Sequence, residues 1–256
     1  MGVAVSSSYG EGSEASTFSS FSFQRTHLLL CIEYIGDDEY DPIWSALDAR
    51  GAIVFIHGTQ TPSSTPIAHP TLGLPITAVY HPQNIYIYMV LTHEQVPHET
   101  FKAAAHLVVN GKTRRFSRLE LIFAHMGGST LPLMSRVAGL SPYMGAPLSE
   151  EEILSEFRRY WWDAALSGSC ATRIAESWGF GDRILWGSDF PGASSSGDII
   201  WIADWAPKAV SVDTIRWFDC DLEKAYKADP SNLENVYRRN VLQLFDSHGI
   251  KLSLGN

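Results

Sequence analysis

Residues 52–57 read AIVFIH, five apolar residues followed directly by a histidine. A short run of this kind is typical of a strand that is buried on both faces, as in a parallel sheet covered by helices. Two later stretches have the same form, LELIFAH at 119–125 and RILWGSD at 183–189. Each is followed by a turn that contains glycine or proline. The pattern therefore predicts strands that end in a polar side chain.

The rest of the chain alternates strand-like and helix-like patterns. We expect further strands at 2–7 and 160–164, and helices at about 42–50, 99–110, 130–139, 150–159, 170–178, 198–206 and 232–245. Strands that alternate with helices are typical of a parallel sheet, so the expected fold class is α/β. At 256 residues and 45% hydrophobic composition, one domain spanning 1–256 is favoured.

The polar residues at the strand ends are candidates for a shared site. In a parallel α/β barrel the carboxyl ends of all strands lie on one face, which would bring His57, His125 and Asp189 together. Imidazole and carboxylate groups suit zinc or manganese, and a second histidine that titrates near neutrality can relay protons. Each residue also has a purely structural interpretation. His57 could be a buried core histidine, His125 could simply precede a glycine turn, and Asp189 could be a helix cap or part of a turn. Their common placement favours a site.

Asp163 is a further polar residue at a strand end, after Trp161 and Trp162 in the stretch YWWDA at 160–164. Its carboxylate could orient a ligand or could accept hydrogen bonds from backbone N–H groups. The sequence leaves both alternatives open.

Charge and composition argue against several classes of protein. The net charge is -9, with 19 basic and 28 acidic residues and no dense run of lysine and arginine, so we expect no nucleic-acid partner. The apolar stretches fall far short of the roughly 18 residues needed to span a bilayer, so we expect no membrane insertion. Three well-separated cysteines suit a reducing compartment, and we expect the cytoplasm.

The motif set resembles the amidohydrolase-related family, which includes aminocarboxymuconate-semialdehyde decarboxylase and fungal 6-methylsalicylate decarboxylases. The matching segments are AIVFIHGTQTPSSTPIAHPTLGLPI at 52–76, the stretch 96–128 that ends in HMGG, YWWDAALSG at 160–168 and ILWGSDFP at 184–191. Their order along the chain, rather than any one segment, makes the resemblance specific.

The resemblance implies a distorted (β/α)8 TIM barrel that holds one divalent metal, zinc or manganese. It implies that His57 is a metal ligand, that Asp189 is a metal ligand able to move a proton, and that His125 is the acid/base beside the metal. Arg136 resembles an arginine that in some relatives reaches the substrate carboxylate of the neighbouring subunit. A homodimer acting on a small carboxylic acid is the corresponding expectation.

One feature of the family is not found in this sequence. Members carry two metal ligands as His-x-His or Glu-x-His on the first barrel strand, whereas none of the nine histidines here forms such a pair. By resemblance, residues 2–10 match the fourth barrel strand and its loop. We therefore expect an incomplete barrel, with strands 4 to 8 present and strands 1 to 3 missing.

Two stretches do not follow the strand–helix rhythm, at about 11–34 and 77–95. Loops longer than about 15 residues without structure of their own are uncommon in compact domains. We interpret both as insertions and hypothesise retained introns or gene-model errors. The chain would match relatives smoothly if Tyr9–Gly10 met Gly36–Asp37 and if Ile76 met Val96.

The leading functional hypothesis is a metal-dependent, non-oxidative decarboxylase of a small aromatic or unsaturated carboxylic acid, such as a salicylate-like acid. The first alternative is a hydrolase of the same superfamily, in which the metal would activate water for attack on a lactone or amide. The second is a truncated, non-catalytic remnant, because two protein ligands bind a metal more weakly than three or four.

Overall fold

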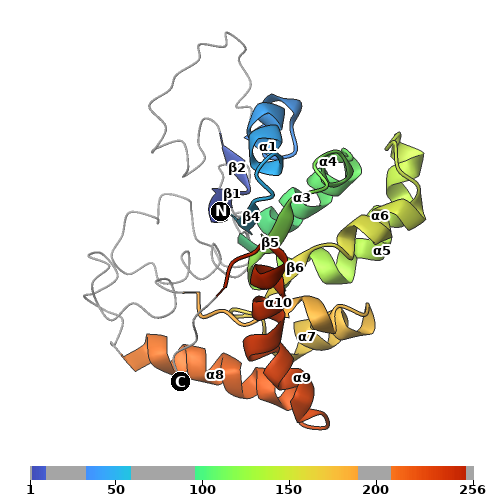
Figure 1. Ribbon diagram of the computed structural model, residues 1–256. Helices are drawn as coiled ribbons and strands as arrows, with labels where there is room; N and C mark the ends of the chain where they lie inside the picture. The colour runs from blue at the N-terminus through green and yellow to red at the C-terminus, as the bar shows by residue number, and fades with distance from the viewer. Residues whose placement is uncertain (1, 10–32, 59–95, 190–208, 252–256) are drawn as a thin grey trace, which may run out of the picture. The chain divides into compact units, whose positions relative to one another are not determined.

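The computed structural model describes residues 2–9, 33–58, 96–189 and 209–251 (Figure 1). The chain divides into two compact units. Unit 1 comprises Met1–Phe123 and Gly127–Arg159, and unit 2 comprises Ala124–Met126 and Tyr160–Asn256. Parallel strands alternate with helices along the chain, which confirms the predicted α/β class.

Unit 1 is built on three parallel strands in the order β1 (Gly2–Ser6), β4 (Ile53–His57) and β5 (Glu120–Phe123). The central strand β4 is the apolar run identified in the sequence, and Ile53, Val54 and Ile56 are at most 6% exposed. The predictions of strands at 2–7 and 52–57 are therefore confirmed to within one residue at each end.

Among the described residues of unit 1, four helices were predicted, and a short fifth one at Lys112–Arg115 was not. They are α1 (Asp41–Asp48), α3 (Val96–Val109), α4 (Lys112–Arg115), α5 (Thr130–Leu140) and α6 (Glu150–Phe157). Helix α3 contacts β4, α5 and α6. The start of α6 is a capping box, in which the Ser149 hydroxyl accepts from the Glu152 N–H and the Glu152 carboxylate accepts from the Ser149 N–H.

A second, two-stranded sheet pairs β2 (Ser8–Tyr9) with β3 (Glu33–Tyr34) in antiparallel fashion. Tyr9 is the register partner of Glu33, so the described chain stops and resumes at neighbouring positions. Most of the predicted insertion at 11–34 and all of that at 77–95 lie outside the described residues.

Unit 2 contains two short parallel strands, β6 (Trp161–Asp163) and β7 (Ile184–Leu185). Trp162 is fully buried, stacks on Phe180 with 5.7 Å between ring centroids, and makes an edge contact with Tyr160. The helices are α7 (Gly168–Ser177), α8 (Ala209–Ala225), α9 (Pro230–Glu234) and α10 (Asn240–Ser247), with the π-helical segment Asn235–Arg239 between the last two.

Two predicted strands are longer than the observed ones. The predictions at 119–125 and 183–189 correspond to β5, which ends at Phe123, and β7, which ends at Leu185. His125 and Asp189 have φ angles of 54° and 59°, in the left-handed region, which an extended strand cannot accommodate. Both side chains therefore lie in turns after the strands.

The helices of unit 2 differ from prediction in two places. The helix expected at 198–206 lies outside the described residues, and α8, which was not predicted, follows at Ala209–Ala225. Its aspartates and its cysteine have low intrinsic helix propensity, which conceals the helix in the sequence. The closing helix expected at 232–245 is divided by the π-helical turn.

None of the helices within the described ranges is both long enough and apolar enough to cross a bilayer.

Candidate active site

The turn after β5 gives His125 an unusual backbone conformation. His125 and its neighbour Met126 both have φ of 54°, with ψ of 47° and 30°. Left-handed conformations cost a residue other than glycine roughly 1–2 kcal/mol, so surrounding contacts must hold the turn. Met126 is completely buried, which anchors one side of it.

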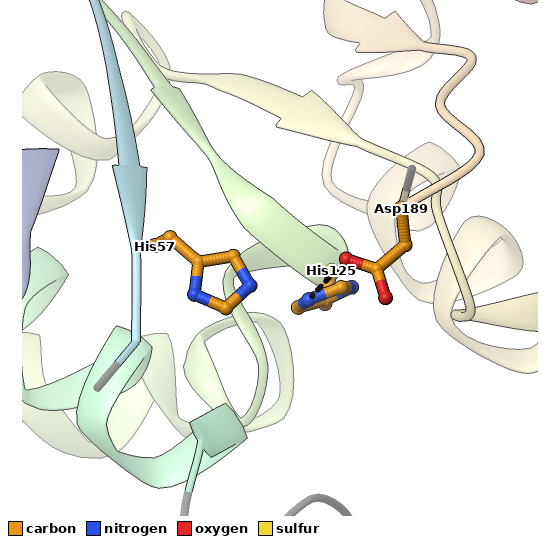
Figure 2. A group of neighbouring side chains, drawn as sticks. All are labelled: His57, His125 and Asp189. Carbon is orange, nitrogen blue, oxygen red and sulfur yellow. Dashed lines mark ion pairs between the residues drawn. The ribbon is translucent and has the colours of Figure 1, made fainter. Parts of the chain in front are cut away.

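The imidazole of His125 is held by a backbone carbonyl within unit 2, to which His125 also belongs. His125 Nδ1 lies 3.0 Å from the carbonyl oxygen of Ala165. Because a carbonyl oxygen can only accept, Nδ1 carries the hydrogen and the lone pair of the neutral ring is on Nε2. That nitrogen lies 3.6 Å from Oδ1 of Asp189, an ion pair when His125 is protonated (Figure 2).

Asp189 lies in the segment after β7 and points its carboxylate at His125 (Figure 2). The side chains of His125 and Asp189 are 13% and 24% exposed, respectively. This partial burial limits screening by water and strengthens their electrostatic interaction relative to a surface pair.

Asp163, the last residue of β6, contacts the backbone of His125. Its Oδ2 accepts from the backbone N–H of His125 at 3.4 Å, and its Oδ1 accepts from that of Ala165 at 3.1 Å. The residue is only 7% exposed, and this burial raises the pKa of its carboxyl group. The sequence left two roles open for Asp163, which were to orient a ligand or to accept hydrogen bonds from backbone N–H groups. In the structure its carboxylate accepts such hydrogen bonds.

His57 is the last residue of β4 in unit 1. Its Nδ1 lies 2.6 Å from the carbonyl oxygen of Gly58, so Nδ1 is again the donor and Nε2 carries the lone pair. The backbone carbonyl of His57 accepts from the N–H of Ser7, which continues the pairing of β1 with β4 beyond the strand itself. Both histidines are thus in the tautomer that leaves Nε2 as the basic nitrogen.

Within unit 1, the paired strands β4 and β5 end at matching positions. In the parallel pairing of β4 with β5, Ile56 is the register partner of Phe123. His57 follows Ile56 directly, and His125 follows Phe123 after one intervening residue. His57 is thus one residue beyond the paired position of β4, and His125 is two residues beyond that of β5.

Arg136, the predicted substrate-binding arginine, lies on α5 of unit 1. Its side chain is exposed. An exposed position on a helix permits contact with another molecule but does not by itself identify one.

Sequence reasoning missed the groups that set the tautomers of the two histidines. These are the backbone carbonyls of Gly58 and Ala165. Every residue type has a backbone carbonyl, so no sequence signal could have identified them. The contribution of Asp163 was detectable as one of two alternatives because an aspartate at the end of an apolar strand is unusual.

Comparison with known proteins places these features in a family. The amidohydrolase family model matches residues 27–246. The 6-methylsalicylic acid decarboxylase of Penicillium expansum is 32% identical over 163 residues, which cover 62% of this chain and 45% of that enzyme. The chain thus spans less than half the length of this relative.

Solved structures agree with the fold. IDCase of Metarhizium anisopliae in its apo form superimposes with a TM-score of 0.62 at 17% identity, covering 83% of this chain and 53% of that one. A dihydroxybenzoic acid decarboxylase of Polaromonas with bound manganese and 2-nitroresorcinol gives 0.58 at 18% identity, covering 85% and 57%. At such identities the likeness concerns the fold alone. Because the family model matches most of the length of this chain, the chain belongs to the amidohydrolase family.

Proposed function

We propose that this chain is part of a metal-dependent, non-oxidative decarboxylase that acts on a small aromatic carboxylic acid of the salicylate type. The observation that carries the proposal is the His125–Asp189 pair, in which the basic Nε2 of His125 faces a half-buried carboxylate. The similarity to 6-methylsalicylic acid decarboxylase supports the substrate class.

His57 and Asp189 would hold one divalent metal. Imidazole nitrogen and carboxylate oxygen are donors that suit zinc or manganese, so the residues fit the group chemically. The hydrogen bond from Nδ1 of His57 to Gly58 has the form that usually orients a metal-ligating histidine. When bound, the metal would supply a Lewis acid for the substrate carboxylate and an adjacent oxygen.

His125 would supply the proton that decarboxylation requires. The bond between the ring carbon and the carboxylate breaks, carbon dioxide leaves, and the electron pair stays on the ring carbon. A proton from Nε2 of His125 would then form the new carbon–hydrogen bond, and Asp189 would stabilise the protonated imidazole before transfer. A proton taken up from water would restore the protonated imidazole for the next turnover, and Asp189 would relay it to Nε2.

Arg136 would bind the substrate carboxylate in the neighbouring subunit of a homodimer. Its exposed position on α5 is compatible with that role. A planar guanidinium can bind a carboxylate through two parallel hydrogen bonds, which would orient as well as attract the substrate.

We also propose that residues 1–256 form a single partial barrel domain. Its parallel strands would correspond to strands 4 to 8 of a TIM barrel. The adjacency of Tyr9 and Glu33 supports an insertion between them, because removing it would leave the ends close enough to join.

The test is a purification in the presence of manganese or zinc followed by two measurements. Metal per chain is determined by elemental analysis, and release of labelled carbon dioxide is followed from carboxyl-labelled salicylate, 6-methylsalicylate and 2,6-dihydroxybenzoate. Metal binding with release from at least one acid is the expected result. Hydrolysis of a lactone or amide without decarboxylation would favour the hydrolase, and neither metal nor turnover would favour the remnant.

A further inference from the structure

We propose that Asp163 is a positioning residue that sets the direction in which His125 presents Nε2. Its hydrogen bonds constrain both the turn that carries His125 and the acceptor of the His125 ring. The structural part of the proposal stands alone, and only its effect on catalysis rests on the proposed function.

The backbone N–H of His125 needs a hydrogen-bond acceptor outside the sheet. Beyond the end of β5 and in a left-handed conformation, this donor cannot continue the strand pairing, and a buried N–H without a partner is costly. Oδ2 of Asp163 accepts from it at 3.4 Å. The carboxylate thus opposes the return of the turn to an extended conformation.

The ring of His125 depends on the same carboxylate. Its Nδ1 donates to the carbonyl oxygen of Ala165, and the N–H of Ala165 donates to Oδ1 of Asp163. The two carboxylate oxygens of Asp163 therefore have different partners. Oδ2 accepts from the backbone of His125, and Oδ1 accepts from Ala165, whose carbonyl accepts from the His125 ring. A carboxylate can accept at both oxygens, whereas an amide offers only one acceptor.

Gly187 closely approaches the same carboxylate. A Cβ at position 187 would lie 1.9 Å from Oδ1 and 2.9 Å from Cγ of Asp163, so a side chain there would displace the carboxylate. Gly187 precedes Asp189 by two residues. Asp163 therefore contacts both His125 and the segment that carries Asp189, the partner of His125.

The test is Asp163→Asn, examined by long-range proton–nitrogen correlation spectra of the histidine rings in the full chain. In the wild type, His125 should have hydrogen on Nδ1 only. In the variant, the backbone N–H of either His125 or Ala165 faces an amide NH2 in place of an oxygen. The turn or the Ala165 carbonyl should then move, and we expect His125 to become a mixture of tautomers. The His125 signal is assigned by its loss in His125→Asn, and this readout needs no activity.

Two matched controls accompany the variant. Asp221 also accepts a backbone N–H, that of Ser169, but within the contact between α7 and α8, so Asp221→Asn should leave His125 unchanged. His248 Nδ1 lies 3.1 Å from the carbonyl oxygen of Leu244, which makes it an internal reference for the same tautomer.

A second variant approaches the carboxylate from its other side. Gly187→Ala should displace Asp163 and produce the same change at His125, which keeps the proposal testable if Asp163→Asn does not fold. An unchanged His125 tautomer in a folded Asp163→Asn or Gly187→Ala protein would overturn the proposal. Unfolding of both variants would overturn it as well, since the carboxylate would then be a requirement of the fold.

If the wild type decarboxylates, Asp163→Asn should lower kcat by about 10²-fold with little change in KM, because substrate would still bind but proton transfer would be misaligned. A wild type without activity would contradict the proposed function while leaving the tautomer measurement decisive for Asp163.

Discussion

Nε2 of His125 lies 3.6 Å from Oδ1 of Asp189, and the opposite ring nitrogen is engaged by the carbonyl of Ala165. The ring therefore has one nitrogen fixed as a donor and the other directed at a carboxylate.

Replacing His125 by asparagine should remove the proposed proton donor while retaining the fold. We expect kcat for decarboxylation to fall by about 10²–10⁴-fold, the usual contribution of general acid–base catalysis, with KM nearly constant. Steady-state kinetics measure both. His248→Asn is the matched control, because Nδ1 of His248 also meets a backbone carbonyl, that of Leu244. Equal kcat values for His125→Asn and the wild type would remove His125 from the mechanism.

Arg136→Ala should weaken substrate binding. A charge-assisted hydrogen bond contributes roughly 1.5–3 kcal/mol, which corresponds to an increase in KM of about tenfold or more. Kinetics together with sedimentation measure binding and oligomeric state in the same samples. Arg158→Ala removes an exposed arginine at the end of α6 and serves as the control. If both variants kept the wild-type KM, the role of Arg136 would be wrong.

Trp162→Ala should destabilise unit 2 strongly. Trp162 is fully buried and packs against Phe180 and Tyr160, and removal of such a side chain costs about 3–5 kcal/mol. Denaturant unfolding followed by circular dichroism measures the loss. Trp217 is 59% exposed, so Trp217→Ala should change the free energy of unfolding by no more than about 0.5 kcal/mol. Similar losses in the two variants would contradict this packing.

Asp221 should contribute stability that depends on pH. Hydrogen bonds from the backbone and side chain of Ser169, and then Lys224, lower the pKa of Asp221. A carboxyl group whose pKa is lower in the folded state stabilises the protein above its unfolded pKa of about 3.9, and this contribution is lost as the pH falls through the folded pKa. The Tm difference between wild type and Asp221→Asn should therefore be larger at about pH 6 than at about pH 3.

Asp246→Asn provides the comparison for that series, since Asp246 is an exposed residue of α10. Its Tm should follow that of the wild type across the pH range. A Tm difference for Asp221→Asn that stayed constant with pH would show that the carboxylate charge is not the source of the stabilisation.

Several features could be predicted from the sequence because each depends on a local pattern. The apolar run at 52–57 required a buried strand, and its final residue, His57, is at the end of β4. The acidic start of α6 follows the Ser149–Glu152 capping pattern. Such features need only residue types at fixed spacing.

Other features depend on contacts between distant residues, which spacing does not encode. The left-handed turn at His125 is held by Asp163, 38 residues away, and its ring is oriented by a carbonyl 40 residues away. The predicted continuation of the strand through His125 was wrong for this reason. Helix α8 was missed because tertiary packing against α7 outweighs its weak intrinsic propensity.

The most direct test of the central claim is the metal content of the purified chain and of two variants, His57→Ala and Asp189→Asn, by elemental analysis. We predict about one zinc or manganese per wild-type chain and a loss of most of it in both variants, because each removes a proposed ligand. His248→Asn should retain the metal. Equal metal content in all four proteins, or none in the wild type, would contradict the account.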